Sequence, residues 1–172
     1  MKQQLHLFTT KPDSYYGLDT CLRRQKLSAL HVDEAYRFIY VAPFGPYKHL
    51  VTITKKTDTY KLRNFVYQSD NGDVCTIIEQ FDKDLNVHDW NKITGFFYDG
   101  DLWGMKEDNG RHGHDGDDLS VEAYKKDNDG NNAKYSRVHC WIPPEKGIRE
   151  AYNYILLKSE SRKGCVSMKE NK

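Results

Sequence analysis

The chain has 172 residues, of which 38% are hydrophobic, 30% charged and 13% aromatic, and its formal net charge is +1. This length is typical of a single domain with one core, and the aromatic content excludes a disordered chain, because large rings bury enough apolar surface to offset the entropy lost on folding. The chain contains no run of about 18 apolar residues, so we expect no membrane-spanning helix.

The N-terminal residues and the cysteines predict a cytoplasmic protein. Met1 to His6 lack the apolar stretch of a signal peptide. The cysteines lie far apart and form no CxxC pair, a spacing that favours a reducing compartment, although two disulfide bridges remain compatible with it. They are Cys21, Cys75, Cys140 and Cys165.

The first half of the chain predicts one short helix and then a β-meander. Leu18, Cys21 and Leu22 fall at helical spacing within residues 14–27, although Gly17 weakens this helix. β-rich runs separated by turn-like residues follow, and Asn71-Gly72 supplies the positive φ angles of a tight hairpin turn. The predicted strands are residues 36–41, 50–54, 60–68 and 74–81.

The second half predicts a helix, a hairpin and a final helix. Asn86 is a good N-cap for a helix that ends by Gly100, because apolar residues recur behind it at intervals of three and four. Two strands, 119–125 and 133–142, are joined by a turn-rich segment, and Pro143-Pro144 ends the second. Apolar residues at helical spacing over 148–156 then mark the last helix.

These elements predict one α+β domain over residues 1–172, an antiparallel sheet (a meander plus a C-terminal hairpin) with helices packed on one face. We expect residues 1–30 and 159–172 to be less ordered. No internal repeat or proline-rich linker marks a domain boundary.

Charge is unevenly distributed along the chain. Residues 1–67 carry a net charge of +6, residues 70–130 carry −10 and residues 131–172 carry +5. Such blocks can fold into a mixed surface, or the acidic block can form a face that binds a basic partner.

A histidine- and aspartate-rich loop is the strongest candidate for chemistry. His112, His114 and Asp115 superficially resemble the HxHxDH ligand run of metallo-hydrolases, but no histidine occupies position 117. We therefore predict a solvated loop without a metal or cofactor, and keep a metal-assisted hydrolase that uses these three residues as the alternative.

Other catalytic and nucleic-acid signals are weak. Cys140 follows His139, but adjacent strand residues point to opposite faces, so the imidazole would not activate that thiol. The strand histidines His49 and His139 are expected to face solvent or to be hydrogen-bonded in the core. No phosphate-binding loop is present and basic pairs such as Arg23-Arg24 are short, so a nucleic-acid partner is not expected.

Several segments together resemble a family of uncharacterised bacterial proteins, over most of the chain after residue 34. The segments are Glu34 to Phe38, Asp101-Leu102-Trp103, Asp115-Gly116 leading to Val121-Glu122, and Tyr135 to Pro143. The chain departs from the family at Leu119, where an aromatic residue is common, and at Cys140, where a basic residue often precedes the tryptophan. The resemblance implies a fold and no activity.

We expect a non-catalytic binding protein, specifically a cytosolic immunity-type protein that neutralises a bacterial toxin by protein–protein contact. The solitary domain, the abundant Tyr and Trp residues and the acidic block all favour this function. Its partner would be a protein with a basic surface. The predicted charge contacts are Glu107, Asp108, Asp115, Asp117 and Asp118, and the predicted anchors are Tyr98 and Trp103.

Overall fold

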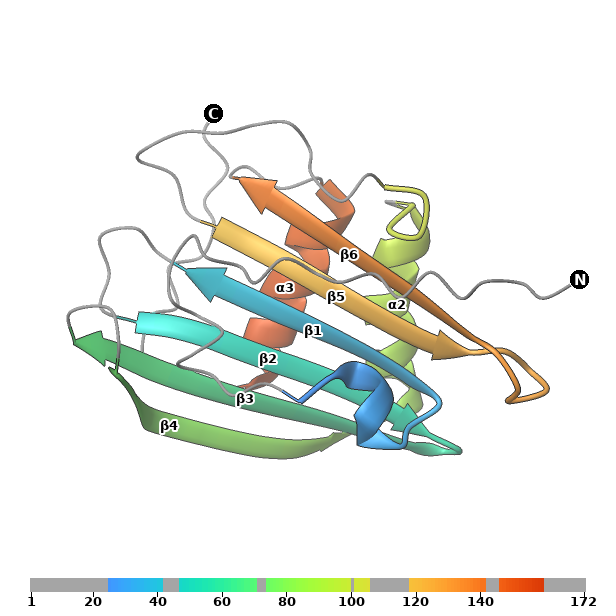
Figure 1. Cartoon of the computed structure of the whole chain (residues 1–172), viewed down its shortest axis with the longest axis horizontal. Coiled ribbons are helices and arrows are strands. Elements are labelled where there is room, and N and C mark those ends of the chain that lie inside the picture. The colour runs from blue at the N-terminus through green and yellow to red at the C-terminus, as the bar shows by residue number, and fades with distance from the viewer. Residues whose placement is uncertain are drawn as a thin grey trace, which may run out of the picture.

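The computed structural model describes residues 25–41, 47–70, 74–99, 101–105, 118–141 and 146–159. Within them lies one antiparallel sheet with the spatial strand order β4-β3-β2-β1-β5-β6 (Figure 1). The strands are β1 (Glu34–Val41), β2 (Tyr47–Lys56), β3 (Thr59–Asp70), β4 (Val74–Leu85), β5 (Asp118–Lys126) and β6 (Ala133–Trp141). The helices are η1 (Leu27–Leu30, a 3-10 helix), α2 (Val87–Asp99) and α3 (Lys146–Ser159). The predicted α+β class is confirmed.

Strands β1 to β4 form the predicted meander, because each pairs antiparallel with the next along the chain. The turn between β2 and β3 contains Thr57 at φ 52°, a left-handed conformation that β-branched residues rarely adopt. The amide of Thr57 donates to Asp33 Oδ2 over 2.6 Å. This bond fixes the turn against the residue that precedes β1.

The C-terminal hairpin, β5 and β6, joins the sheet through β1 rather than through β4. β5 pairs antiparallel with β1 on the side away from β2, so Phe38 has Val51 on one flank and Val121 on the other. β1 is therefore an inner strand, and all eight of its residues are buried.

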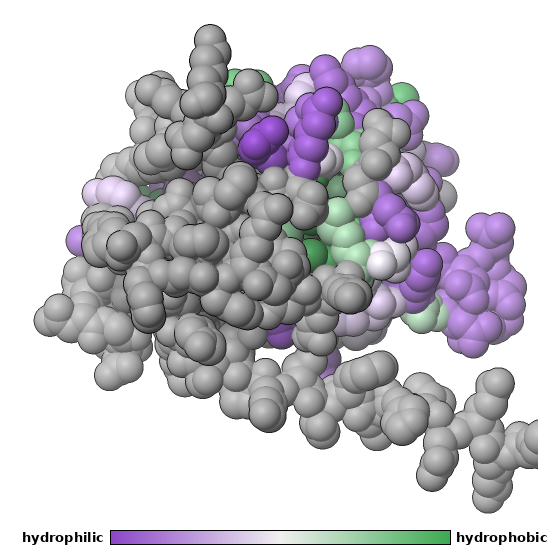
Figure 2. Space-filling model, turned by 90° about the horizontal axis from the view of Figure 1, so that it is seen from above, coloured by the Kyte–Doolittle hydropathy of each residue, from purple (hydrophilic) through white to green (hydrophobic). Residues whose placement is uncertain are grey.

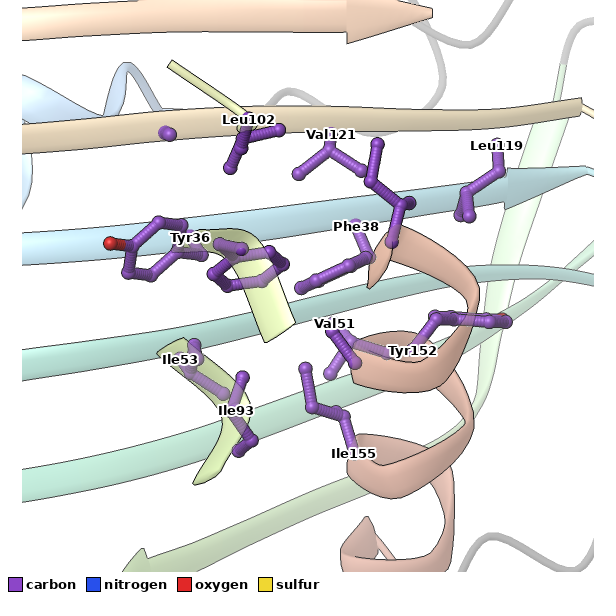
Figure 3. Packing of buried hydrophobic residues seen from close by; sticks show 14 of the residues in the cluster. Tyr36, Phe38, Val51, Ile53, Ile93, Leu102, Leu119, Val121, Tyr152 and Ile155 are labelled. Carbon is purple, nitrogen blue, oxygen red and sulfur yellow. The ribbon is translucent and has the colours of Figure 1, made fainter. Parts of the chain in front are cut away.

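The core lies between the sheet and the two α-helices, which cover one face (Figure 1). The Phe38 ring stacks on Phe97 of α2 and Tyr152 of α3, with centroid distances of 5.7 and 5.8 Å. Figure 3 shows strand side chains such as Val51 and Ile53 pointing toward the helices, where Ile93 and Ile155 meet them. Each such side chain contributes roughly 1.5–3 kcal/mol when fully buried.

The two α-helices are joined by polar contacts of Asp89 at the edge of the core. Asn86 caps α2 as predicted, since its Oδ1 accepts from the Asp89 amide over 2.8 Å. The Asp89 carboxylate reaches α3, where it accepts from the Tyr154 hydroxyl over 2.7 Å and lies 2.8 Å from Lys158 Nζ. The first turn of α2 is thus held against the end of α3.

The opposite face of the sheet carries η1, where Leu27 packs with Val32, Ala35 and Tyr124. The helix predicted over residues 14–27 falls mostly outside the described residues, and Gln25 and Lys26 are not helical. The expectation of weaker order at residues 1–30 and 159–172 also falls largely outside them. None of the described helices has the length and apolar character needed to cross a membrane.

Candidate binding surface

The two predicted aromatic anchors lie at the C-terminal end of α2. Tyr98 is in the last turn of the helix and is 60% exposed, whereas Trp103 lies in the following turn and packs partly against the core. Backbone hydrogen bonds hold this turn, from the Leu102 amide to the Phe97 carbonyl over 3.0 Å and from the Gly104 amide to the Asp101 carbonyl over 2.9 Å. The backbone carrying both aromatic residues is therefore fixed.

Two lysines from the hairpin contact these aromatic side chains. Lys125 Nζ lies 3.1 Å from the Tyr98 hydroxyl and 5.9 Å from the centre of its ring. Lys134 Nζ lies 5.1 Å from the centre of the Trp103 ring. The lysines are cross-strand partners in β5 and β6. Each ammonium is within the range of a cation–π interaction. We call Tyr98, Trp103, Lys125 and Lys134 the anchor surface.

Two buried residues, Glu34 and Tyr36, contact the residues of the anchor surface from the interior of the protein. Glu34 is only 6% exposed, and its carboxylate accepts from the Tyr36 hydroxyl and lies 3.5 Å from Lys125 Nζ. The Tyr36 ring meets the Trp103 ring edge-on, with 6.2 Å between centroids. This continuous chain of contacts links Tyr98 to Trp103 through the interior.

The surroundings of Lys125 and Tyr36 shift the pKa of both groups upward. Burial opposes the positive charge on Lys125, but the Tyr98 hydroxyl and the Glu34 carboxylate outweigh it and raise the pKa of the ammonium. Burial, followed by the nearby Glu34 carboxylate, raises the pKa of Tyr36, so its hydroxyl stays a donor. The network therefore holds the Lys125 ammonium and the Tyr36 hydroxyl as donors next to the Glu34 carboxylate.

Figure 2 looks down on the β6 edge and the turn after α2, where hydrophilic residues form most of the described surface. Hydrophobic residues form a short strip among them. Tyr98 is one of the large hydrophobic side chains exposed in the described part of the chain, and aromatic residues of this kind are enriched in protein interfaces.

Asp118, the one predicted charge contact within the described residues, lies far from the anchor surface. It begins β5, whereas Lys125 lies seven residues further along, about 23 Å away at the usual rise per strand residue. Its side chain is 15% exposed, and Oδ1 lies 2.6 Å from His139 Nε2. The structure thus does not bring Asp118 and the anchors together.

The remaining predicted contacts fall outside the described residues. These are Glu107, Asp108, Asp115 and Asp117, and the candidate metal ligands His112 and His114 share that segment. Within the described ranges, no group of three or more histidine, cysteine or acidic residues could hold a metal ion.

His139 and Cys140 point to opposite faces, as the strand alternation predicts. The Cys140 side chain is fully buried on the helix-covered face, whereas His139 meets Asp118 on the other. His49 differs from expectation, because it is 1% exposed and neither ring nitrogen has a hydrogen-bond partner among the described residues. The neighbouring Asn64 side chain is in the same situation.

Sequence reasoning missed Lys125, Lys134 and Glu34 as parts of the site. The predicted hairpin could have indicated that the two lysines lie near each other, because both stand close to the turn-rich segment 127–132 that joins the strands. Glu34 joins them only through the long-range pairing of β1 with β5. No local pattern predicts that register.

Comparisons with known proteins assign the chain to no family. No known family model matches the chain. No curated protein is similar to it in sequence.

Proposed function

We propose that the chain is a non-catalytic binding protein and that Tyr98 and Trp103 anchor its partner. The observation that carries this proposal is the anchor surface itself. An exposed tyrosine and a half-buried tryptophan are each held by a lysine, and a buried carboxylate and phenol support them.

Rigid aromatic anchors suit binding for an energetic reason. Association loses about 0.5–1.5 kcal/mol for every rotamer-rich side chain that it immobilises. The contacts with Lys125 and Lys134 already restrict Tyr98 and Trp103 in the free protein. More of their burial energy is then available to the complex, as in interface hot spots, where Tyr and Trp are enriched.

The partner that we propose is a bacterial toxin domain, neutralised in the cytoplasm by a covering contact. The acidic block of the sequence supports a basic partner surface, with Glu107, Asp108, Asp115, Asp117 and Asp118 as proposed charge contacts. The anchor surface itself carries two lysines, so the partner groups that meet it should include hydrogen-bond acceptors.

The test has two stages. A photo-cross-linking phenylalanine analogue placed at position 98 captures the partner in an extract of the native host, with the same analogue at position 135 as the control. Tyr135 is matched to Tyr98 because it is also an exposed tyrosine, at 52% exposure, and its side chain lies on the opposite face of β6 from its neighbour Lys134. The captured protein is then purified for affinity measurements.

Calorimetric titration of that protein should show a loss of affinity of about 30-fold for Tyr98→Ala and for Trp103→Ala, as for interface hot spots. Tyr135→Ala should bind as the unmodified chain does. Equal affinities for all three variants would remove the anchor surface from the interface.

Elemental analysis checks the catalytic alternative separately. Stoichiometric zinc or manganese that is lost on His114→Ala would support the metal-assisted hydrolase and contradict the binding proposal. The purified protein is measured after dialysis without chelator, and His88→Ala serves as the matched histidine control because it lies on α2.

A further inference from the structure

The face of the sheet opposite α2 and α3 carries one row of mostly charged side chains that crosses all six strands. The strand registers place its members directly beside one another. We call this set the charge row. In spatial order, from β4 to β6, its members are Asp82, Arg63, Thr52, Arg37, Glu122 and Arg137.

Thr52 is the one uncharged member, and its two neighbours in the row are both arginines. Adjacent strands lie about 4.8 Å apart, so the acids Asp82 and Glu122 are each about 10 Å from Thr52 along the row. Coulomb attraction falls with distance, so an anion above Thr52 is attracted by the two arginines more strongly than it is repelled by the two acids.

Both arginines are held in place by those acids. Arg37 is 4% exposed, and its Nη1 lies 3.0 Å from Glu122 Oε2 while Nη2 donates to the Gln25 carbonyl over 2.8 Å. Arg63 Nε lies 2.6 Å from Asp82 Oδ1. A guanidinium has five N–H donors, and this bond uses one of those on Arg63.

The Thr52 hydroxyl is suited to complete an anion site. Its Oγ1 lies 3.5 Å from Arg37 Nε, so the hydroxyl oxygen faces a donor. A hydroxyl also carries one hydrogen that it can donate. An oxyanion at this point would therefore meet the Thr52 hydroxyl and the Arg63 guanidinium from neighbouring strands.

The centre of the charge row forms part of the wall of a groove of about 680 Å³. This volume is within the range of small-molecule sites. The next position on the same face is apolar in β1, β2 and β3, where Ile39, Leu50 and Phe65 lie side by side. Leu50 and Phe65 line the groove together with Tyr67. The Arg63 guanidinium lies 6.0 Å from the centre of the Phe65 ring. The lining of the groove thus includes both arginine side chains and apolar side chains.

We propose that this groove binds a small amphipathic carboxylate. The carboxylate group lies over Thr52 and is bound by Arg63, and the apolar part of the molecule lies on Leu50 and Phe65. A carboxylate fits this point of the row, because its two oxygens can accept from the Thr52 hydroxyl and the Arg63 guanidinium together. Guanidinium groups match the planar geometry of a carboxylate.

The test uses 4-phenylbutanoate as the probe and 4-phenylbutan-1-ol as its uncharged analogue. Amide chemical shifts of the full chain, followed by nuclear magnetic resonance, should change saturably at Leu50, Thr52 and Phe65. The alcohol should bind at least about tenfold more weakly, because it lacks the charge-assisted hydrogen bonds. Equal binding of acid and alcohol, no saturable binding at millimolar probe, or shifts elsewhere would overturn the proposal.

Variants locate the carboxylate. Arg63→Gln and Thr52→Val should each weaken binding of 4-phenylbutanoate by about tenfold and leave binding of the alcohol unchanged. Lys146→Gln removes the same charge as Arg63→Gln, but from an exposed position at the start of α3, and should have no effect. Unchanged binding in both groove variants would overturn the site. Tyr98→Ala should bind the probe normally, which separates this proposal from the binding function above.

Discussion

The two faces of the sheet bury the same inner strand against very different surroundings. On one face, β1 directs Tyr36 and Phe38 into an aromatic core beneath two helices. On the other, the intervening Arg37 lies in the charge row and is equally buried. One face is thus stabilised by apolar packing, and the other holds a buried charge that needs its counter-ion.

Each face of the sheet also contains residues of the other type, polar ones on the apolar face and apolar ones on the charged face. The helix-covered face holds His49 and Asn64, whose polar atoms have no hydrogen-bond partner among the described residues. The face opposite α2 and α3 holds a small apolar cluster that includes Ile39, Val41 and Leu50. The contrast is therefore between two kinds of stabilisation, and substitutions can measure each.

The largest effect is expected in the aromatic core. Phe38→Ala should lower the free energy of unfolding by about 4 kcal/mol, because the ring stacks on Phe97 and Tyr152 and its removal leaves a cavity. Urea denaturation measures the change. Leu157→Ala, at a residue that is 77% exposed, is the control and should stay within about 0.5 kcal/mol. A similar loss in both variants would contradict the assignment of the core.

The second-largest loss of stability is expected at the buried ion pair of Arg37 and Glu122, on the face opposite α2 and α3. Arg37→Met should lower the free energy of unfolding by about 3 kcal/mol, because it leaves the Glu122 carboxylate buried without its main counter-ion. The double variant Arg37→Met with Glu122→Met should recover most of that loss, since it removes both charges. If the double variant is as unstable as the single one, the cause is packing rather than charge.

Substitution of His49 should change stability less, and it should raise the free energy of unfolding rather than lower it. His49→Leu should raise the free energy of unfolding at pH 7 by about 1 kcal/mol, because it removes two buried polar atoms that lack partners. Denaturation at pH 7 measures the gain, and Asn64→Leu should give a similar one. A loss of stability in both variants would show that these polar groups are satisfied in solution.

The pH dependence of stability provides an independent measurement of His49. Burial lowers the pKa of its imidazole below the ordinary value of 6.5, and the Glu79 carboxylate only partly offsets that effect. The unfolded chain therefore binds a proton at pH values where the folded chain does not. Stability from this group is complete above pH 6.5 and falls as the pH drops below it, by up to about 1.4 kcal/mol per unit. His49→Leu should remove this slope.

The exposed end of the charge row should show the smallest effect. Arg63→Gln breaks the ion pair with Asp82, but both side chains are about half exposed, so the free energy of unfolding should fall by at most about 0.5 kcal/mol. Thermal and urea denaturation at low and high salt measure the change. A loss as large as that of Arg37→Met would contradict the distinction between the buried centre and the exposed end.

Much of the fold followed from local patterns. Apolar residues at helical spacing behind Asn86 predicted α2, and the cap hydrogen bond confirms where it begins. The Asn71-Gly72 turn predicted the pairing of β3 with β4, which the register confirms. Such signals depend only on neighbouring residues in the sequence, so they can be recognised without knowing how the rest of the chain folds.

The candidate site was predictable only in part. Tyr98 and Trp103 were selected as aromatic anchors for a binding protein, and they lie in the last turn of α2 and in the turn that follows it. Their supports, Lys125 and Glu34, come from strands that are distant in sequence. The predicted acidic contacts were chosen from net charge along the chain, which gives no position in space.

The amino-acid sequence determined the type and order of the elements and which residues of each are apolar, because hydrogen bonding and side-chain direction repeat with a fixed local period. Only the tertiary structure decided that β5 lies beside β1. That pairing aligns Glu122 with Arg37 and Lys125 with Glu34. Pairing between distant strands depends on the packing of the whole sheet against its helices, and a local pattern does not contain that information.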